Sequence, residues 1–179
     1  FIYGDQLFFE DFSSPDDGWT MEGRWEIGSG FGGYNTTPPG MLYVYYPSQP
    51  DGSDPYNHYM LSPNIPLGDE STVLVKFDFG LDGWPSTEHT NGMIIEYNGG
   101  SGWIPALSYE ISPSDGSTVD IARRTESFYA DINGSIQLRF HAYGTNSYYI
   151  DAWIFDNIEI LTVPQFSNIS ISSNNSINN

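Results

Sequence analysis

The stretch Thr-Val-Leu-Val-Lys-Phe-Asp-Phe at residues 72–79 decides the fold class. Every second side chain in it is a valine or a phenylalanine, and the positions between them include Lys76 and Asp78. Successive side chains of a β-strand point to opposite faces, so this alternation predicts a strand with one face in a core. The same period of two returns at residues 93–97 and at 136–141, where Ile136, Leu138 and Phe140 alternate with Gln137, Arg139 and His141. No segment shows the sustained spacing of apolar residues that an amphipathic helix requires.

Further strands are predicted on both sides of this stretch, at residues 7–12, 41–46 and 153–163, which brings the expected number to roughly eight to ten. Glycine and proline, which total 19 and 12, are scattered between the apolar runs and favour many short strands joined by turns. The segment Asn-Gly-Gly-Ser-Gly at residues 98–102 predicts a hairpin turn. The polar segment 112–127 is predicted to be a long connection with a short strand near its middle.

These patterns predict an all-β protein, a jelly-roll β-sandwich of two antiparallel sheets with almost no helix. A chain of 179 residues is long enough for one such domain with a sizeable core. We place the sandwich at residues 7–163. Extended segments are expected on either side, at residues 1–6 and at residues 164–179, and the second of these is rich in serine and asparagine.

The charge balance is unusual because basic residues are scarce. Asp and Glu total 23 whereas Lys and Arg total 5, which gives a formal net charge of -18. Without a basic surface to neutralise phosphates, nucleic acid is excluded as a partner. Divalent cations are the expected counter-charge. The sequence contains no cysteine and no apolar run of the roughly 20 residues that a membrane-spanning helix needs.

Several features are typical of a secreted or cell-surface protein. The chain begins at Phe1 rather than at methionine, which is typical of a mature form after removal of a signal peptide. Four Asn-X-Ser/Thr sequons also lie in turn-like or terminal sequence. They predict covalent N-linked glycans, and their asparagines are Asn35, Asn133, Asn168 and Asn174.

A series of short motifs resembles MAM-like jelly rolls, a superfamily that includes choice-of-anchor modules and carbohydrate-binding sandwiches. The resemblance covers roughly residues 7–161, and it implies the sandwich fold and an extracellular setting. The sequence lacks the cysteines of vertebrate MAM domains, which argues against a receptor-type role. The motifs, in chain order, are Phe-Glu-Asp-Phe at 9–12 with Gly-Trp at 18–19, Leu-Ser-Pro at 61–63, Val-Lys-Phe-Asp-Phe at 75–79, Glu-Tyr-Asn-Gly-Gly-Ser-Gly-Trp at 96–103, Ile-Gln-Leu-Arg-Phe at 136–140 and Trp-Ile-Phe-Asp-Asn-Ile at 153–158.

Two carboxylates are expected to face the core. Alternation places Glu10 on one face with Phe8 and Phe12, and Asp156 on one face with Ile154, Ile158 and Ile160. A buried carboxylate must be paired, protonated or bound to a metal. Carboxylate and carbonyl oxygens are the ligands that calcium takes, and members of the resembled superfamily often carry structural calcium near these two strands. We therefore predict a structural Ca²⁺ ion held by Glu10, Asp11 and Asp156, with further aspartates at 16 and 17 nearby. The alternative is that Glu10 caps turn amides or pairs with Arg139.

No pattern in the sequence indicates an enzyme. His58, His89 and His141 lie far apart without the spacing of zinc ligands, and no nucleophile motif is present. A weaker hypothesis is that exposed aromatic side chains stack on sugars. The residues proposed for this role are Trp84, Tyr148 and Tyr149.

Two functions remain open, and neither is catalytic. The first is a structural subunit of an extracellular filament or surface assembly, a homo-oligomer or polymer whose copies join by strand addition. Apolar residues in the C-terminal segment, namely Phe166, Ile169 and Ile171, would make that contact. The alternative is a calcium-stabilised carbohydrate-binding or adhesion module. The sequence analysis favours the first.

Overall fold

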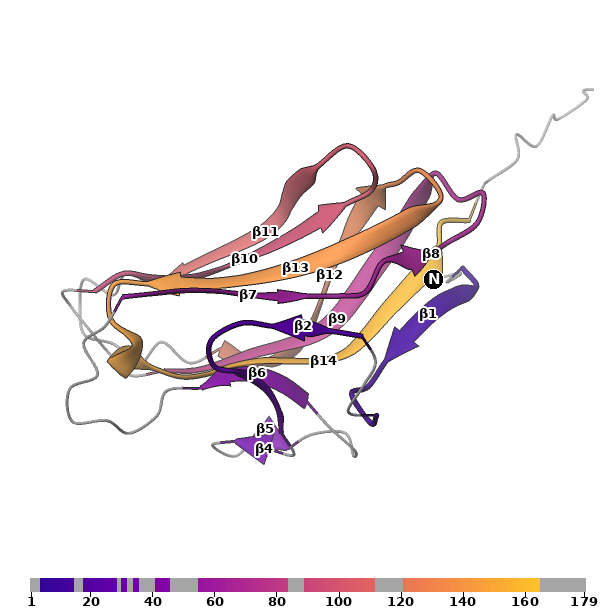
Figure 1. Ribbon diagram of the computed structural model, residues 1–179. Helices are drawn as coiled ribbons and strands as arrows, with labels where there is room; N and C mark the ends of the chain where they lie inside the picture. The colour runs from indigo at the N-terminus through magenta and orange to yellow at the C-terminus, as the bar shows by residue number, and fades with distance from the viewer. Residues whose placement is uncertain are drawn as a thin grey trace, which may run out of the picture.

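The computed structural model describes residues 4–14, 18–28, 30–31, 34–35, 41–45, 55–83, 89–111 and 121–164, with the backbone alone at 30–31, 34–35 and 41–45. It is a β-sandwich of two six-stranded antiparallel sheets, which confirms the predicted fold class (Figure 1). The described part of the chain contains one short 3-10 turn, η1 (Ser147–Tyr149), and no helix long and apolar enough to cross a membrane.

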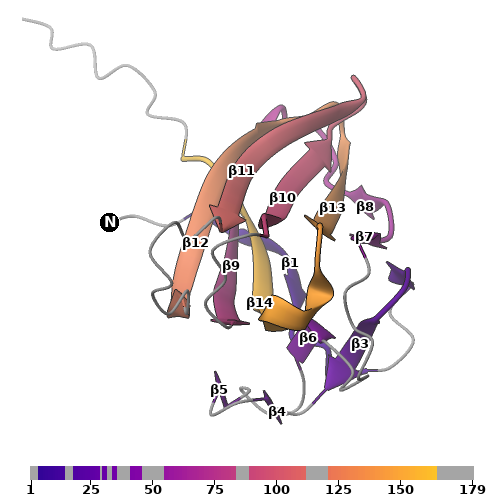
Figure 2. The same ribbon diagram turned by 90° about the vertical axis from the view of Figure 1, so that its left-hand side faces the viewer.

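The β14 sheet forms one layer of the sandwich, and the long strand β14 is at its centre (Figure 2). β9 pairs along one side of β14, while β6 and β1 share the other side, β6 beside residues 152–155 and β1 beside residues 158–161. The strand order is β12-β9-β14-β6-β3. Its strands are β1 (Gln6–Glu10), β3 (Trp25–Gly28), β6 (Met41–Tyr45), β9 (Thr72–Gly83), β12 (Ile121–Asp131) and β14 (Ile150–Thr162).

The β13 sheet forms the opposite layer, in the order β11-β10-β13-β7-β2, and β8 also pairs with β13. The predicted turn at residues 98–102 joins β10 to β11, which confirms the hairpin. A separate two-stranded sheet contains β4 (Gly30–Phe31) and β5 (Tyr34–Asn35). The strands of the β13 sheet are β2 (Thr20–Met21), β7 (Tyr56–Leu61), β8 (Ile65–Pro66), β10 (Asn91–Asn98), β11 (Trp103–Ile111) and β13 (Ser135–Gly144).

Aromatic rings from both sheets meet in the core. The alternation at residues 72–79 is confirmed, because all four of its valines and phenylalanines are fully buried. Phe155 of β14 lies at the centre, with its ring centroid 5.2 Å from that of Phe79 and 4.5 Å from that of Phe140 on the facing sheet. Such contacts stabilise a sandwich through buried area and ring geometry together.

The predicted connection at residues 112–127 is wrong from residue 121 onward. Residues 121–131 form β12, which pairs with β9 at the edge of the β14 sheet. The outer face of an edge strand meets solvent, so polar side chains such as Thr125 and Ser127, which lie opposite Asp78 and Lys76, are tolerated where the backbone supplies the pairing. The polar composition of β12 therefore predicts a loop where the structure has a strand.

A β-bulge interrupts β14 between Asp156 and Glu159, where Asn157 adopts a φ of 49°. Asp156 lies opposite Asp78, a residue that alternates with the core phenylalanines of β9 and so faces away from the core. Beyond the bulge, Ile158 belongs to the core. The expectation that Asp156 and Ile158 share a face is therefore wrong, because the extra residue of a bulge breaks the period of two.

Candidate functional site

A row of aromatic and charged side chains crosses the outer face of the β13 sheet. Alternation along β13 turns Arg139, His141 and Tyr143 away from the core, because the residues between them are fully buried. The antiparallel register places Tyr59 of β7 opposite His141, and Glu96 of β10 opposite Arg139. Together with the first residue of β11, these side chains form what we call the outer strip: Tyr59, Glu96, Trp103, Arg139, His141 and Tyr143.

The guanidinium of Arg139 is held at the centre of one half of the outer strip. Its Cζ atom lies 4.3 Å from the ring centroid of Trp103 and 5.0 Å from that of Tyr59. Arg139 Nε donates to Glu96 Oε2 at 2.6 Å, and Nη2 donates to Glu96 Oε1 at 2.8 Å. This bidentate pair neutralises the charge and fixes the orientation of the guanidinium between the two rings.

The other half of the outer strip is a stack of rings. Tyr59 and His141 stack at 4.3 Å with an angle of 23° between their planes, and the ring of Tyr143 lies 5.5 Å from that of His141. His141 Nε2 contacts Asn57 Oδ1, an amide oxygen that accepts a hydrogen bond from the tautomer protonated at Nε2. Tyr143 lies across Gly92, where a Cβ would approach its ring to 2.4 Å.

Burial lowers the pKa of His141, an effect that the charge of Glu96 opposes and that of Arg139 reinforces. His141 is therefore neutral at neutral pH. Because Glu96 neutralises Arg139, the outer strip as a whole carries no net charge. It offers rigid aromatic surfaces and a few oriented polar groups, which is the composition of a site for an uncharged polar ligand.

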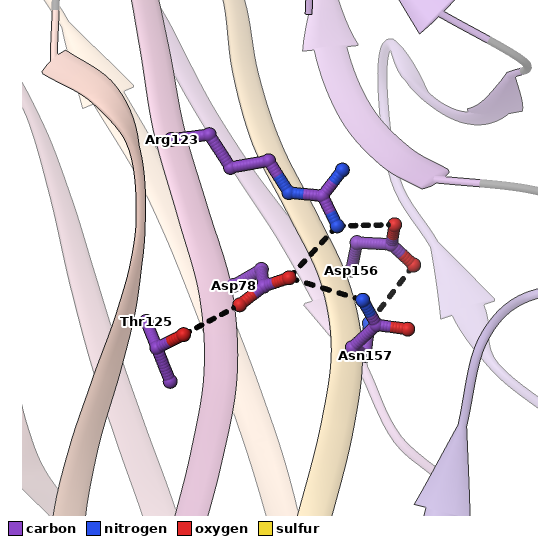
Figure 3. A network of polar contacts seen from close by, with 5 residues as sticks. All are labelled: Asp78, Arg123, Thr125, Asp156 and Asn157. Carbon is purple, nitrogen blue, oxygen red and sulfur yellow. Dashed lines mark hydrogen bonds and ion pairs between the residues drawn. The ribbon is translucent and has the colours of Figure 1, made fainter. Parts of the chain in front are cut away.

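A second polar cluster lies on the outer face of the β14 sheet (Figure 3). Arg123 Nη2 of β12 donates to Asp78 Oδ2 and to Asp156 Oδ2, in both cases at 2.8 Å. Asp78 also accepts from Thr125 Oγ1 at 2.9 Å and from Asn157 Nδ2 at 3.0 Å. The cluster joins three strands. In it the fully buried carboxylate of Asp156 is paired with the guanidinium of Arg123.

Glu10 faces the inside of the sandwich, at the end of β1. Its Oε1 accepts from the backbone N–H of Phe12 at 2.6 Å, and its Oε2 accepts from Trp19 Nε1 at 3.1 Å. The suggestion that Glu10 caps a turn amide therefore agrees with the structure, whereas the suggested pairing with Arg139 does not. Glu10 lies opposite the core residue Ile158, so Glu10 and Asp156 face opposite sides of the β14 sheet.

These placements do not fit one calcium shell that contains Glu10, Asp11 and Asp156. Asp11 accepts from the backbone N–H of Ser13 at 3.0 Å, and hydrogen bonds to Ser13 lower its pKa. The described residues contain no cluster of three or more acidic or histidine side chains that could hold a metal. Residues 15–17, which include the two other suggested aspartates, lie outside the described residues. A calcium site at the end of β1 stays a prediction.

Thermal unfolding with and without a chelator tests this calcium prediction. If Glu10 and Asp11 help to hold Ca²⁺, excess EDTA should lower Tm, because a ligand that binds only the folded state stabilises it. In the Glu10→Gln variant, EDTA should have little further effect on Tm. An unchanged Tm for the unmodified chain after dialysis against EDTA would contradict the prediction.

Two of the aromatic residues predicted to stack on sugars, Tyr148 and Tyr149, do not belong to the outer strip. Tyr148 and Tyr149 lie in η1, at the turn from β13 to β14, with their rings edge to face at 5.3 Å. Tyr148 is 53% exposed, and Tyr149 stacks on His89. Trp84 lies outside the described residues.

Of the predicted glycosylation sites, Asn133 is exposed in the turn between β12 and β13. Asn35 belongs to β5, where the backbone alone is described. N-linked glycosylation of these residues stays a prediction. The remaining predicted glycosylation and assembly residues lie outside the described part of the chain, and they are Asn168, Asn174, Phe166, Ile169 and Ile171.

Comparison with known proteins shows the fold and leaves the family open. No protein-family model and no curated protein sequence matches the chain, so the resemblance to MAM-like domains stays a prediction. A cleaved adhesin domain of Lys-gingipain from Porphyromonas gingivalis is similar in structure, with a TM-score of 0.63 and 16% identity over 90% of this chain and 100% of that one. A second cleaved adhesin domain of the same protein has a TM-score of 0.61 and 14% identity, over 89% of this chain and 100% of that one. The module TmCBM61, in complex with β-1,4-galactotriose, has a TM-score of 0.51 and 9% identity, over 86% of this chain and 94% of that one.

Proposed function

We propose that the chain is a non-enzymatic, extracellular adhesion module that binds a neutral carbohydrate on the outer strip. The observation that carries this proposal is the fixed arrangement of Arg139 between the rings of Trp103 and Tyr59. Aromatic rings supply apolar faces for the C–H groups of a sugar, and fixed polar groups can meet its hydroxyls. The strip lies on paired strands of a packed sandwich, so little conformational entropy would be lost on binding.

The charges of the chain favour a neutral glycan over an acidic one. Two of the five N–H bonds of Arg139 are taken by Glu96, whose carboxylate neutralises the guanidinium, and His141 is neutral. The net charge of -18 repels polyanions at long range. The similar fold of TmCBM61, which was solved with β-1,4-galactotriose, supports uncharged oligosaccharides as the first ligands to test.

The binding test compares two tyrosines in the same protein. On an array of neutral, uronate-containing and sulfated glycans, we expect saturable binding to neutral glycans. Tyr59→Ala should weaken this binding at least roughly tenfold, which corresponds to about 1.4 kcal/mol, because it removes a ring from the centre of the site. Tyr148→Ala, at an exposed ring of η1, should leave the affinity unchanged.

Two results of this experiment would contradict the proposal. One is a reversal, in which Tyr148→Ala loses binding and Tyr59→Ala keeps it, because the site would then lie at η1. The other is binding to sulfated or uronate-containing glycans alone. A circular dichroism spectrum and a thermal melt of each variant separate a loss of binding from a loss of fold.

We also propose that copies of the chain assemble outside the cell into a filament or surface layer. The observation that favours assembly is the edge strand β1. Its residues Leu7 and Phe9 are exposed, and it pairs with β14 along one side only among the described strands. Assembly and glycan binding use different sheets, so one protein can do both. Sizes measured by light scattering over a range of concentrations test assembly directly: we expect large particles, and a monomer at every concentration would contradict it.

A further inference from the structure

The edge strand β1 carries two exposed apolar side chains and no exposed charge. Leu7 is 38% exposed and Phe9 is 47% exposed. Glu10, the one ionisable residue of β1, is buried. Among the described strands, β14 alone pairs with β1. An exposed apolar edge with unpaired backbone groups is a template for another strand.

The remaining edges carry features that discourage strand addition. β12 bears the charged side chains of Arg124 and Glu126. β11 contains Pro105, which has no N–H to donate, and its register shifts beside that residue. β2 has two residues, and β3 has four, including the exposed Glu26. Short, charged or proline-containing edges are the usual protection of sheets against one another. β1 has no proline and no exposed charge, and with five residues it is longer than β2 and β3.

The segment 165–179 of the chain has the composition that this edge would accept. It contains no charged residue, in a chain whose net charge is -18. Ile169 and Ile171 alternate in it with serine and asparagine, which is the period of a strand. A donor without charge avoids repulsion by the acidic surface and by Asp5 and Asp11, which flank β1.

The chain direction favours a donor from a second copy. β14 runs antiparallel to β1 and ends beside its start, where the N–H of Thr162 donates to the carbonyl oxygen of Asp5 at 2.9 Å. A segment that turned back from Thr162 along the free edge would run parallel to β1. Parallel pairing is slightly less stable per residue than antiparallel pairing, so an antiparallel strand supplied by a second copy is the better-paired donor.

We infer that residues 165–179 of a second copy add an antiparallel strand to the free edge of β1. This inference rests on the assembly proposed above and assigns its acceptor and its donor. Fifteen residues can extend over roughly 50 Å, far enough to cross from one sandwich to the next. The contact is heterologous, because the donor and the acceptor are different surfaces, so repetition generates an open polymer or a ring.

Disulfide trapping between single-cysteine chains tests this contact, since the unmodified chain has no cysteine. A Phe9→Cys chain is mixed with an Ile169→Cys chain of different mass under mild oxidation. Ile171→Cys is tested in the same way, because a donor strand shifted by two residues would bring Ile171 beside Phe9 in place of Ile169. We expect a mixed dimer. As the control, Tyr129→Cys replaces Phe9→Cys, since Tyr129 is 67% exposed on the opposite edge of the same sheet.

Each other outcome identifies what is wrong. Equal trapping of Tyr129→Cys, or trapping of Phe9→Cys with itself alone, would overturn the proposed contact. If a chain that carries both Phe9→Cys and Ile169→Cys forms the disulfide within one monomer, the inference that the donor comes from a second copy is overturned. If light scattering shows large particles but neither donor position traps Phe9→Cys, the acceptor edge is wrong and assembly stands. If the unmodified chain stays monomeric, both proposals fail.

Discussion

Arg123→Met is expected to lower the free energy of unfolding by about 3–5 kcal/mol, because it leaves a buried carboxylate without its cation. The guanidinium of Arg123 binds both Asp78 and Asp156, and Asp156 is fully buried. Domains of this size are stable by about 5–15 kcal/mol, so the variant should lose a large part of its stability. Urea denaturation followed by tryptophan fluorescence measures the change.

Arg124→Met is the matched control. Arg124 is the next residue along β12, its side chain is 54% exposed, and it pairs with Glu126 at the surface. Exposed ion pairs contribute little to stability, so the midpoint of denaturation should hardly move. Equal midpoints for the two variants would contradict the role assigned to Arg123.

The effect of Arg123→Met should also depend on pH. Burial raises the pKa of Asp78, but hydrogen bonds from Asn157, Arg123 and Thr125 together with the charge of Arg123 outweigh it, so the net pKa lies below the ordinary value of 3.8. A carboxyl whose pKa is lowered on folding stabilises the protein above its unfolded pKa and loses that contribution as the pH falls through the folded pKa. The stability difference between the unmodified chain and Arg123→Met should therefore narrow below about pH 4.

Phe155→Ala is expected to lower the free energy of unfolding by about 3–5 kcal/mol, because it opens a cavity where the two sheets meet. Phe155 is fully buried, and its ring lies against Phe77, Phe79 and Phe140. For a chain of this length the loss corresponds to a fall in Tm of roughly 10 °C. Differential scanning calorimetry measures it.

Tyr129→Ala removes an aromatic ring of similar size from the surface, where Tyr129 is 67% exposed. It should change the free energy of unfolding by no more than about 0.5 kcal/mol. If Phe155→Ala cost no more than Tyr129→Ala, the packing of the two sheets around Phe155 would be wrong.

The fold could be predicted from the sequence because β9 and β13, which lie inside the two sheets, alternate over most of their length. The stretch 72–79 is buried at every second position, as its pattern predicts. Edge strands are harder to predict, because solvent on their outer face permits polar residues, and for that reason the sequence of β12 predicts a connection. The bulge at Asp156 was also missed, because no local feature of the sequence marks the extra residue.

Only part of the outer strip could be predicted from the sequence. Alternation along β13 predicted that Arg139 and His141 face away from the core, but it could not say what lies beside them. Their partners Tyr59 and Glu96 come from other strands, and the register between strands depends on packing over the whole sheet. Because the register between strands cannot be derived from local sequence, the sequence predicts calcium rather than Arg123 as the partner of the Asp156 carboxylate.

The central claim, that the outer strip binds a neutral glycan, is tested most directly by nuclear magnetic resonance of the arginine Nε–H groups. The chain has four arginines, so each signal can be assigned by a single substitution. On titration with a neutral oligosaccharide that binds on the array, the signal of Arg139, whose Nε–H points to Glu96 in the strip, should shift and saturate at the same Kd. The signal of Arg123, on the other sheet, should stay in place. An unchanged Arg139 signal at saturating ligand, or a shift of the Arg123 signal alone, would contradict the account.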